Sequence, residues 1–175
     1  MFAYNNIVLE PLSENKIELV RNWRNSPEIL ANMQYQAIIT KAGQIKWFEE
    51  LQKENCYYFM VKANEKDAGL IHINKINEQE KTAEVGLFIG EKDFVGTGIA
   101  LYASSLLLLF AFEELQLKKL KAKVNSSNKI AIDYNGFLGF EFFEKLDEQF
   151  NYYELTKETY ELKKPVFQKL LSLPL

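Results

Sequence analysis

The chain has 175 residues, of which 47% are hydrophobic and 14% aromatic, enough for one folded domain with an ample core. Its net charge of −3 gives no general attraction for a phosphate polymer, so we expect no nucleic-acid partner. One cysteine, and the lack of a secretory leader or of an apolar run of about 20 residues, predict a cytoplasmic protein outside the membrane.

The first half of the sequence predicts a strand, two main helices and an antiparallel meander. Residues 7–12 are expected to form an edge strand, because Pro11 closes it. Helices are predicted over residues 14–25 and 41–53, the second capped by Thr40. Three segments rich in aromatic and β-branched residues then predict consecutive strands: residues 57–62, 68–73 and 82–89.

The second half predicts a strand-helix-strand unit and a closing pair of strands. A long apolar helix over residues 99–117 leads into a strand over 120–124, where polar and apolar side chains alternate. Another helix is expected over residues 129–137. The closing antiparallel strands and a short terminal helix are predicted at residues 140–150, 152–163 and 165–174.

These elements predict a single α/β domain over residues 1–175, with a mixed central sheet of about seven strands flanked by helices. No repeat or linker interrupts their order. The aromatic side chains of the closing strands would allow two chains to pair edge to edge, which permits a homodimer.

Two glycines, Gly96 and Gly98, lie where a predicted strand ends and the long apolar helix begins. Their bare backbone allows successive N–H groups to point into one concavity, to which the first-turn amides of Ile99 and Ala100 add the positive end of the helix dipole. This arrangement binds an anion such as a diphosphate. The alternative is that the glycines only permit a tight turn.

Two other nucleotide-binding motifs do not fit this loop. A Rossmann fingerprint needs a third glycine for close helix packing, and Leu101 stands at that position. A P-loop needs Lys followed by Ser or Thr after its last glycine, where this chain has Ile99 and Ala100. Both motifs are therefore excluded.

Three segments carry a resemblance to a known family. Residues 93–98, Asp-Phe-Val-Gly-Thr-Gly, are similar to the pattern Gln/Arg-x-x-Gly-x-Gly/Ala; residues 124–134 resemble the strand end and helix that follow it; and Gly139-Phe140 closes that helix. Together they resemble the GNAT N-acetyltransferases, which bind acetyl-CoA. Upstream, residues 23–28, 47–48 and 68–71 resemble the branch with ribosomal-protein alanine and amino-sugar (pseudaminic acid type) acetyltransferases.

The resemblance implies how the donor, acetyl-CoA, is held without a metal. Loop amides hold the diphosphate, the strand before the loop pairs with the pantetheine arm, and residues beyond the next strand meet the donor from the other side. Asp93 departs from the family pattern, so the amides must carry more of the binding. The expected donor-binding residues are Leu87, Phe88, Ile89, Val95, Gly96, Thr97, Gly98, Ile99, Ala100, Asn125, Asn128 and Ala131.

Acetyl transfer from a thioester to an amine needs a base for the amine proton, a donor to the oxyanion and an acid for the departing thiolate. The resemblance implies Glu84 as the base, directly or through water, and Tyr134 as the acid. A backbone N–H of the strand over residues 82–89, near Phe88 or Ile89, is the expected oxyanion donor. The alternatives are that Glu84 is a solvated residue balancing Lys75 or Lys81, and that Tyr134 is a packed core tyrosine.

Two further residues are weighed and set aside. An imidazole ordinarily titrates near neutral pH, which makes His72 a second base candidate, but its place in an alternating strand favours an ordinary packed or surface histidine. Cys56 would act as a nucleophile only with a base beside it, and no histidine is near it in the sequence. Direct attack of the amine is therefore preferred.

Acceptor recognition is expected in the first helical region, where charged and aromatic residues are mixed. Arginines suit a diphosphate, and aromatic rings cover a base or the apolar face of a sugar. The alternative is that the tryptophan only anchors the helix and the arginines are solvated. The expected acceptor residues are Arg21, Trp23, Arg24, Asn25, Met33 and Tyr35.

The sequence thus predicts an acetyl-CoA-dependent N-acetyltransferase that acts on a primary amine in a ternary complex. An amino-sugar nucleotide of surface-glycan synthesis is the favoured small-molecule acceptor, ahead of a protein N-terminus of the ribosomal-protein alanine type. A non-catalytic acyl-CoA-binding domain is the alternative from a different class.

Overall fold

The computed structural model describes the backbone of residues 2–4 and 6–172 and the side chains of residues 6–172. Within these residues eight strands form one sheet, in the order β1-β2-β3-β4-β5-β6-β8-β7. Neighbouring strands run antiparallel, except that β5 and β6 are parallel. The strands are β1 Phe2–Tyr4, β2 Ile7–Pro11, β3 Tyr57–Ala63, β4 Lys66–Asn77, β5 Thr82–Ile89, β6 Lys119–Asn125, β7 Glu141–Lys145 and β8 Phe150–Thr156. The expected mixed sheet is confirmed, with one strand more than the seven expected.

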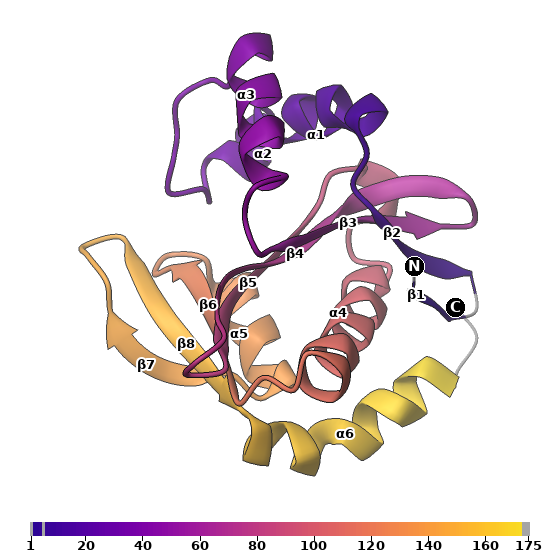
Figure 1. Ribbon diagram of the computed structural model, residues 1–175, viewed down its shortest axis with the longest axis vertical. Helices are drawn as coiled ribbons and strands as arrows, with labels where there is room; N and C mark the ends of the chain where they lie inside the picture. Colours follow the sequence, from indigo (N-terminus) through magenta and orange to yellow (C-terminus); the bar gives the residue numbers. More distant parts are fainter. Residues whose placement is uncertain (1, 5, 173–175) are drawn as a thin grey trace.

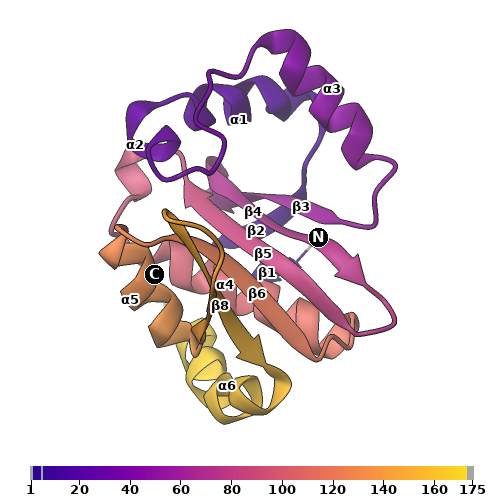
Figure 2. The same ribbon diagram turned by 90° about the vertical axis from the view of Figure 1, so that its left-hand side faces the viewer.

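Helices cover both faces of the sheet (Figures 1 and 2). The face that carries α1, α2 and α3 is called the upper face here, and the face that carries α4, α5 and α6 the lower face. The larger core lies between the lower face and α4 and α6, whereas a smaller cluster joins α1 to the upper face. The helices are α1 Ile17–Arg24, α2 Pro27–Leu30, α3 Lys41–Leu51, α4 Ile99–Leu109, α5 Lys129–Leu138 and α6 Lys157–Ser172, with short turns η1 Glu14–Lys16, η2 Lys92–Phe94 and the π-helical η3 Phe110–Glu114.

The N-terminal strand prediction is wrong in one respect. β2 is not an edge strand, because β1 pairs with it over Ile7 to Leu9 while β3 pairs with it on the other side. Pro11 lies beyond the part of β2 that β1 covers, so its missing N–H leaves no bond unmade on that side. The predicted cap of α3 is confirmed, since Thr40 Oγ1 accepts a hydrogen bond of 3.0 Å from the Gly43 N–H.

The C-terminal prediction also needs correction. The segment after Thr156 is helix α6, not a continuation of the last strand to residue 163, and Pro165 lies inside it. Thr156 Oγ1 accepts from the Thr159 N–H at 3.2 Å, which caps the first turn. Helical spacing then buries one side of α6 in the main core, through Tyr160, Phe167 and Leu171. The last residues of the predicted terminal helix, 173–175, lie outside the described part of the chain.

The pairing between β5 and β6 stops halfway. It runs from Thr82 opposite Lys119 to Val85 opposite Ala122 and no further. β5 nevertheless continues beside β4 to Ile89, and β6 continues beside β8 to Asn125. The two halves of the sheet therefore diverge at its centre, and β5 has an open edge from residue 86 to 89.

Helix α1 is fixed to the upper face by Trp23. The side chain is 8% exposed, and its ring stands edge-on to that of Phe88, with centroids 6.4 Å apart. The same ring covers Gly90, where an added Cβ would lie 2.1 Å from Trp23 Cδ2. Gly90 is therefore required by the close approach of this ring.

We expect Gly90→Ala to lower the free energy of unfolding by about 1–3 kcal/mol, because the methyl group overpacks the Trp23 contact. Gly136→Ala is the matched control. A Cβ at Gly136, inside α5, meets nothing within 4 Å, so alanine there should raise stability by about 0.5–1 kcal/mol. Urea unfolding of both variants checks the pair, and equal effects would contradict this account of Trp23.

Candidate active site

The glycine loop, residues 93–98, has the conformation that the anion-binding prediction requires. Gly96 and Gly98 have φ angles of +79° and +84°, and an added Cβ at either would meet nothing within 4 Å. Within the described chain, no backbone carbonyl accepts from the N–H groups of Gly96, Gly98, Ile99 or Ala100. These four donors lie at the N-terminus of α4, where the helix dipole favours negative charge.

The side chains of the glycine loop contribute little to this site. Thr97 Oγ1 donates to the carbonyl of Phe94 at 2.8 Å, and the Val95 side chain is 65% exposed. Lys92 forms an exposed ion pair of 3.1 Å with Glu28, which ties η2 to α2. The loop therefore offers backbone amides to an anion, as the departure at Asp93 led us to expect.

The open edge of β5 leads directly into the glycine loop. The Gly90 N–H bonds the Ala68 carbonyl of β4 at 2.8 Å, and an added Cβ at Gly69 of β4 would meet the Phe88 carbonyl at 2.2 Å. Because strand residues direct their backbone groups to alternate sides, Leu87 and Ile89 present theirs to the gap beside β6. Of the three residues predicted here, Phe88 turns its backbone towards β4.

The residues predicted beyond β6 shape the far side of the gap. Asn125 Oδ1 accepts from Ser127 N at 2.9 Å and from Ser127 Oγ at 2.7 Å, which closes a tight turn. Asn128 caps α5, since its Oδ1 accepts from the Ala131 N–H at 3.0 Å. Both asparagines therefore already have local partners through their oxygens, and Ala131 packs partly against the main core.

Tyr134 joins α5 to the first turns of α4. Its hydroxyl donates to the Ala100 carbonyl at 2.9 Å and lies 2.6 Å from Ser104 Oγ. Burial raises the pKa of this phenol well above its ordinary value, so it stays protonated near neutral pH. The tyrosine is both packed and hydrogen-bonded. Its hydroxyl lies against the first turn of α4, which follows the glycine loop.

Glu84 lies on the upper face of β5, with its side chain 18% exposed. Its Oε1 accepts from Lys75 Nζ at 2.9 Å and from Tyr152 Oη at 2.9 Å. Burial raises the pKa of this carboxyl, but hydrogen bonds from Lys75 and Tyr152 and nearby lysine charge outweigh burial and lower it overall. Glu84 is therefore ionised at neutral pH. The pairing with Lys75 was foreseen, whereas the contact with Tyr152 on β8 was not.

His72 and Cys56, which the sequence analysis set aside, both make packing or hydrogen-bond contacts in the structure. The His72 ring stacks on Tyr58 with centroids 4.7 Å apart, and burial and the charge of Arg24 lower its pKa to about 4. His72 is thus neutral and packed. The Cys56 thiol contacts the Leu51 carbonyl at 3.6 Å, and burial raises its pKa, which keeps it from acting as a thiolate.

The predicted acceptor residues divide into two groups. Arg21 donates to Glu18 through two nitrogens, at 2.9 and 2.7 Å, and to the Ile39 carbonyl at 3.0 Å. Asn25 makes two further hydrogen bonds to the backbone of Ile39. These residues, like Trp23, hold α1 and the following segment in place. The tryptophan anchors the helix as the alternative stated, but Arg21 is paired with Glu18 and not solvated.

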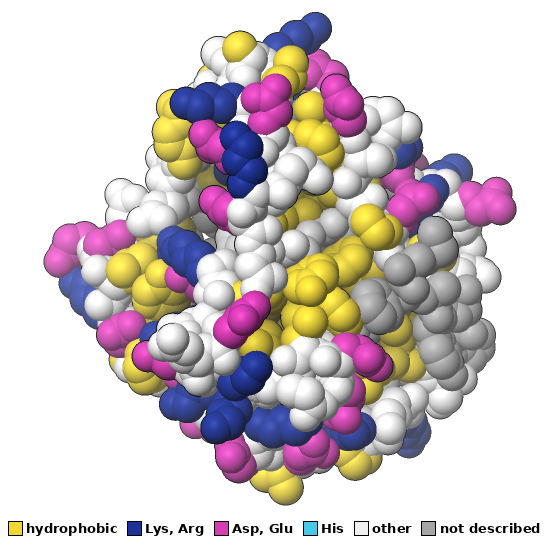
Figure 3. Space-filling model, in the orientation of Figure 1, with side chains coloured by type: hydrophobic (Ala, Val, Ile, Leu, Met, Phe, Trp, Pro, Cys, Tyr) yellow, Lys and Arg dark blue, Asp and Glu magenta, His cyan; other side chains and the backbone are white. Residues whose placement is uncertain are grey.

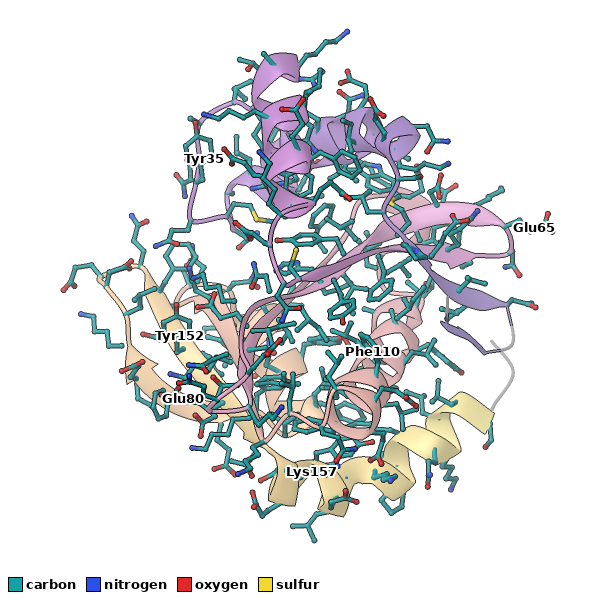
Figure 4. The ribbon with its side chains drawn as sticks, in the orientation of Figure 1. Tyr35, Glu65, Glu80, Phe110, Tyr152 and Lys157 are labelled. Carbon is teal, nitrogen blue, oxygen red and sulfur yellow. The ribbon has the colours of Figure 1, made fainter. Side chains whose placement is uncertain are left out.

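The other acceptor candidates remain available for a ligand. Tyr35 is 61% exposed on the segment between α2 and α3 (Figure 4), and Met33 is half-buried. The half-buried Arg24 guanidinium has no hydrogen bond or ion pair with any of residues 6–172, and burial lowers its pKa. Its charge acts on Tyr58 and His72, so it lies near their stacked rings on the upper face. An unpaired cation in such a place is suited to an anionic ligand.

Neither the face shown in Figure 3 nor the possible metal ligands of residues 6–172 form a further site. On the face shown in Figure 3, basic side chains are interspersed with acidic ones. Over residues 6–172 no three His, Cys, Asp or Glu side chains gather as a metal site would require. No helix in the described chain has the length and apolar character needed to span a membrane.

Comparison with known proteins identifies the class. The sequence profile of the acetyltransferase (GNAT) domain matches residues 6–141, which is most of the chain. The protein therefore belongs to the GNAT acetyltransferase family and is an N-acetyltransferase, a family whose members use acetyl-CoA.

Particular relatives can also be named. The chain is 30% identical over 122 residues to acetyltransferase PseH of Campylobacter jejuni, covering 69% of this chain and 74% of that protein. The crystal structure of that N-acetyltransferase superposes with a TM-score of 0.67 at 24% identity, over 87% of this chain and 99% of that one.

Two other solved structures share the fold. FdhC, described as a nucleotide-linked sugar GNAT, has a TM-score of 0.81 at 19% identity, over 98% of both chains. Spermidine N-acetyltransferase of Vibrio cholerae, solved with CoA and spermine, has a TM-score of 0.78 at 19% identity, over 89% of this chain and 98% of that one.

Proposed function

We propose that this N-acetyltransferase moves the acetyl group of acetyl-CoA to a primary amine of an amino-sugar nucleotide, by direct attack in a ternary complex. The observation that carries the proposal is the open edge of β5 running into the free amides of the glycine loop. An extended ligand with a diphosphate at one end would bind both the strand edge and the loop amides.

The donor side fits acetyl-CoA through backbone groups. The amides of Gly96, Gly98, Ile99 and Ala100 would hold its diphosphate, and the edge of β5 at Leu87 and Ile89 would pair with its pantetheine arm as an added strand does. Acetyl-CoA supplies a thioester whose acetyl carbon bonds the amine nitrogen as the C–S bond breaks and the electron pair leaves on sulfur. A backbone N–H of β5 that the pantetheine arm leaves free would donate to the oxyanion.

Two side chains would move the protons. Glu84 is ionised and would take one proton from the acceptor nitrogen, directly or through one water, which frees the lone pair for attack. Tyr134 is protonated and would give its proton to the departing sulfur. The phenolate formed would be stabilised by the hydroxyl of Ser104, 2.6 Å away, until it regains a proton.

The acceptor side favours an anionic amine. Arg24 would pair with a diphosphate, and the relatives include a nucleotide-linked sugar GNAT. Arg24 lies near His72, which pairs with Gly86 of β5, whereas Glu84 pairs with Asn74. Arg24 and the base Glu84 are therefore separated by two residues along the strands, or about 7 Å. That separation suits one sugar ring between amine and diphosphate. A half-buried, unpaired arginine disfavours a polycation such as spermidine.

The reaction is tested by release of CoA thiol from acetyl-CoA with amino-sugar nucleotides, spermidine and N-terminal peptides. We expect turnover with the sugar nucleotides. Glu84→Gln should lower kcat/KM by a factor of about 10²–10⁴, and Tyr134→Phe should lower kcat by a factor of about 10². Neither variant should change the affinity for CoA. CoA binding without thiol release with any amine would support the non-catalytic alternative. Preference for spermidine or peptides would overturn the acceptor assignment.

Arg24→Gln tests the anionic acceptor. We expect KM for the sugar nucleotide to rise by about 10- to 100-fold, because a charge-assisted contact is lost, while KM for acetyl-CoA and the rate with an amino sugar that lacks phosphate change little. Arg24→Lys should recover part of the loss. Lys46→Gln, at an exposed position of α3, is the control. Equal losses with the sugar nucleotide and with the amino sugar that lacks phosphate would contradict the role of Arg24.

A further inference from the structure

Tyr152 is the residue of this site that no sequence pattern indicated. It lies on β8 (Figure 4), where it faces Lys123 of β6. Its hydroxyl donates to Glu84 Oε1 on β5 at 2.9 Å. The side chain therefore reaches across β6 on the upper face. Because β5 and β6 diverge beyond Val85, this contact joins the two halves of the sheet beside the point where they part.

The ring of Tyr152 is held in place by neighbouring cations. Lys121 Nζ lies 5.6 Å and Lys123 Nζ 5.8 Å from its centroid, within the range of cation–π attraction. Lys121 also lies over Phe143 of β7, and Lys123 Nζ donates to Gln34 Oε1 at 2.8 Å. The orientation of the phenol is thus fixed by residues of β6 before any ligand binds.

Both hydrogen bonds to Glu84 use the same oxygen. Lys75 comes from β4 and Tyr152 from β8, strands on opposite sides of β5, and each donates to Oε1 at 2.9 Å. The second carboxylate oxygen, Oε2, accepts no hydrogen bond from any of residues 6–172. A carboxylate held in this way cannot rotate freely, and one oxygen is left for a ligand.

We propose that Tyr152 is a positioning residue for the catalytic carboxylate: with Lys75 it occupies Oε1, so that Oε2 accepts the proton of the acceptor amine. The inference rests on the proposed role of Glu84 as the base. In the step, the proton passes from nitrogen to Oε2, the nitrogen keeps its electron pair, and Tyr152 keeps its own proton. Burial and the hydrogen bond to Glu84 raise the pKa of Tyr152 to about 12, in agreement with a permanent donor.

Tyr152→Phe removes the donor and keeps the ring between its cations. Its hydrogen bond is one of the contributions that lower the pKa of Glu84, so its loss should raise that pKa. Activity that needs the carboxylate falls as pH drops through this pKa. We therefore expect the acidic limb of the kcat/KM profile to move to higher pH, with a loss of about tenfold in kcat at neutral pH and an unchanged KM for acetyl-CoA.

Three further variants test whether a shift of the acidic limb in Tyr152→Phe acts through Glu84. Lys75→Met should move the acidic limb in the same direction, because it removes the other donor to Oε1. In the Glu84→Gln background, Tyr152→Phe should have no further effect on kcat, since the two residues act as one unit. Tyr57→Phe is the matched control, because Tyr57 packs against Phe110 in the main core, with centroids 5.0 Å apart.

The outcomes separate this inference from the proposed function. A uniform loss of rate in Tyr152→Phe with an unmoved acidic limb, or additive effects of Tyr152→Phe and Glu84→Gln, would overturn the positioning role while leaving the base in place. Full activity and an unchanged acidic limb in Glu84→Gln would overturn the base itself, and the inference with it. Unfolding by urea shows whether any variant has lost its fold.

Discussion

The structure depends on the point where β5 and β6 stop pairing, after Val85 and Ala122. A parallel pair inside a sheet normally satisfies all the backbone groups that face each other. Here the residues of β5 that follow have a strand partner on the β4 side only, and they lead into the free amides at the start of α4. Divergence at the centre of the sheet thus leaves backbone groups without a partner at Leu87 and Ile89, and the amides of Gly96, Gly98, Ile99 and Ala100 are unpaired further along the chain. We propose that a long ligand with a diphosphate binds along these two sets of groups. The side chains of the proposed chemistry, Glu84 and Tyr134, lie on opposite faces beside these groups.

The same divergence explains why polar contacts across the gap matter. Below the sheet, Tyr134 bonds the first turn of α4 and fixes α5 against it. Above the sheet, Tyr152 spans β6 to reach Glu84, and Lys123 reaches Gln34 in the segment between α2 and α3. These contacts connect α5, β8 and β6 to α4, β5 and the segment before α3. They also leave defined atoms free, including Oε2 of Glu84 and the guanidinium of Arg24.

Sequence patterns predicted what is local and missed what is long-range. The glycine spacing, the cap at Thr40 and the α4 start at Ile99 follow from backbone rules and were found in the structure. The family resemblance brought Glu84 and Tyr134 forward, and their catalytic roles stay predictions. The first half of helix α6 was missed because aromatic content suggested strand up to residue 163, although Tyr160, Phe167 and Leu171 have helical spacing. Its second half overlaps the terminal helix that was predicted at residues 165–174. Tyr152 lies 68 residues from Glu84, and only the sheet order brings them together. The pairing of Arg21 is local, because Glu18 lies three residues before it on α1, whereas Arg24 has Arg21 at that spacing.

The central claim is that the open edge of β5 binds the donor. Amide hydrogen exchange measured by NMR, with and without CoA, tests it most directly. Because Leu87 and Ile89 face the gap, we predict that CoA slows exchange of their amides, whereas the Gly90 amide, already bonded to Ala68 at 2.8 Å, is unchanged. Unchanged exchange at Leu87 and Ile89 under saturating CoA would contradict the account.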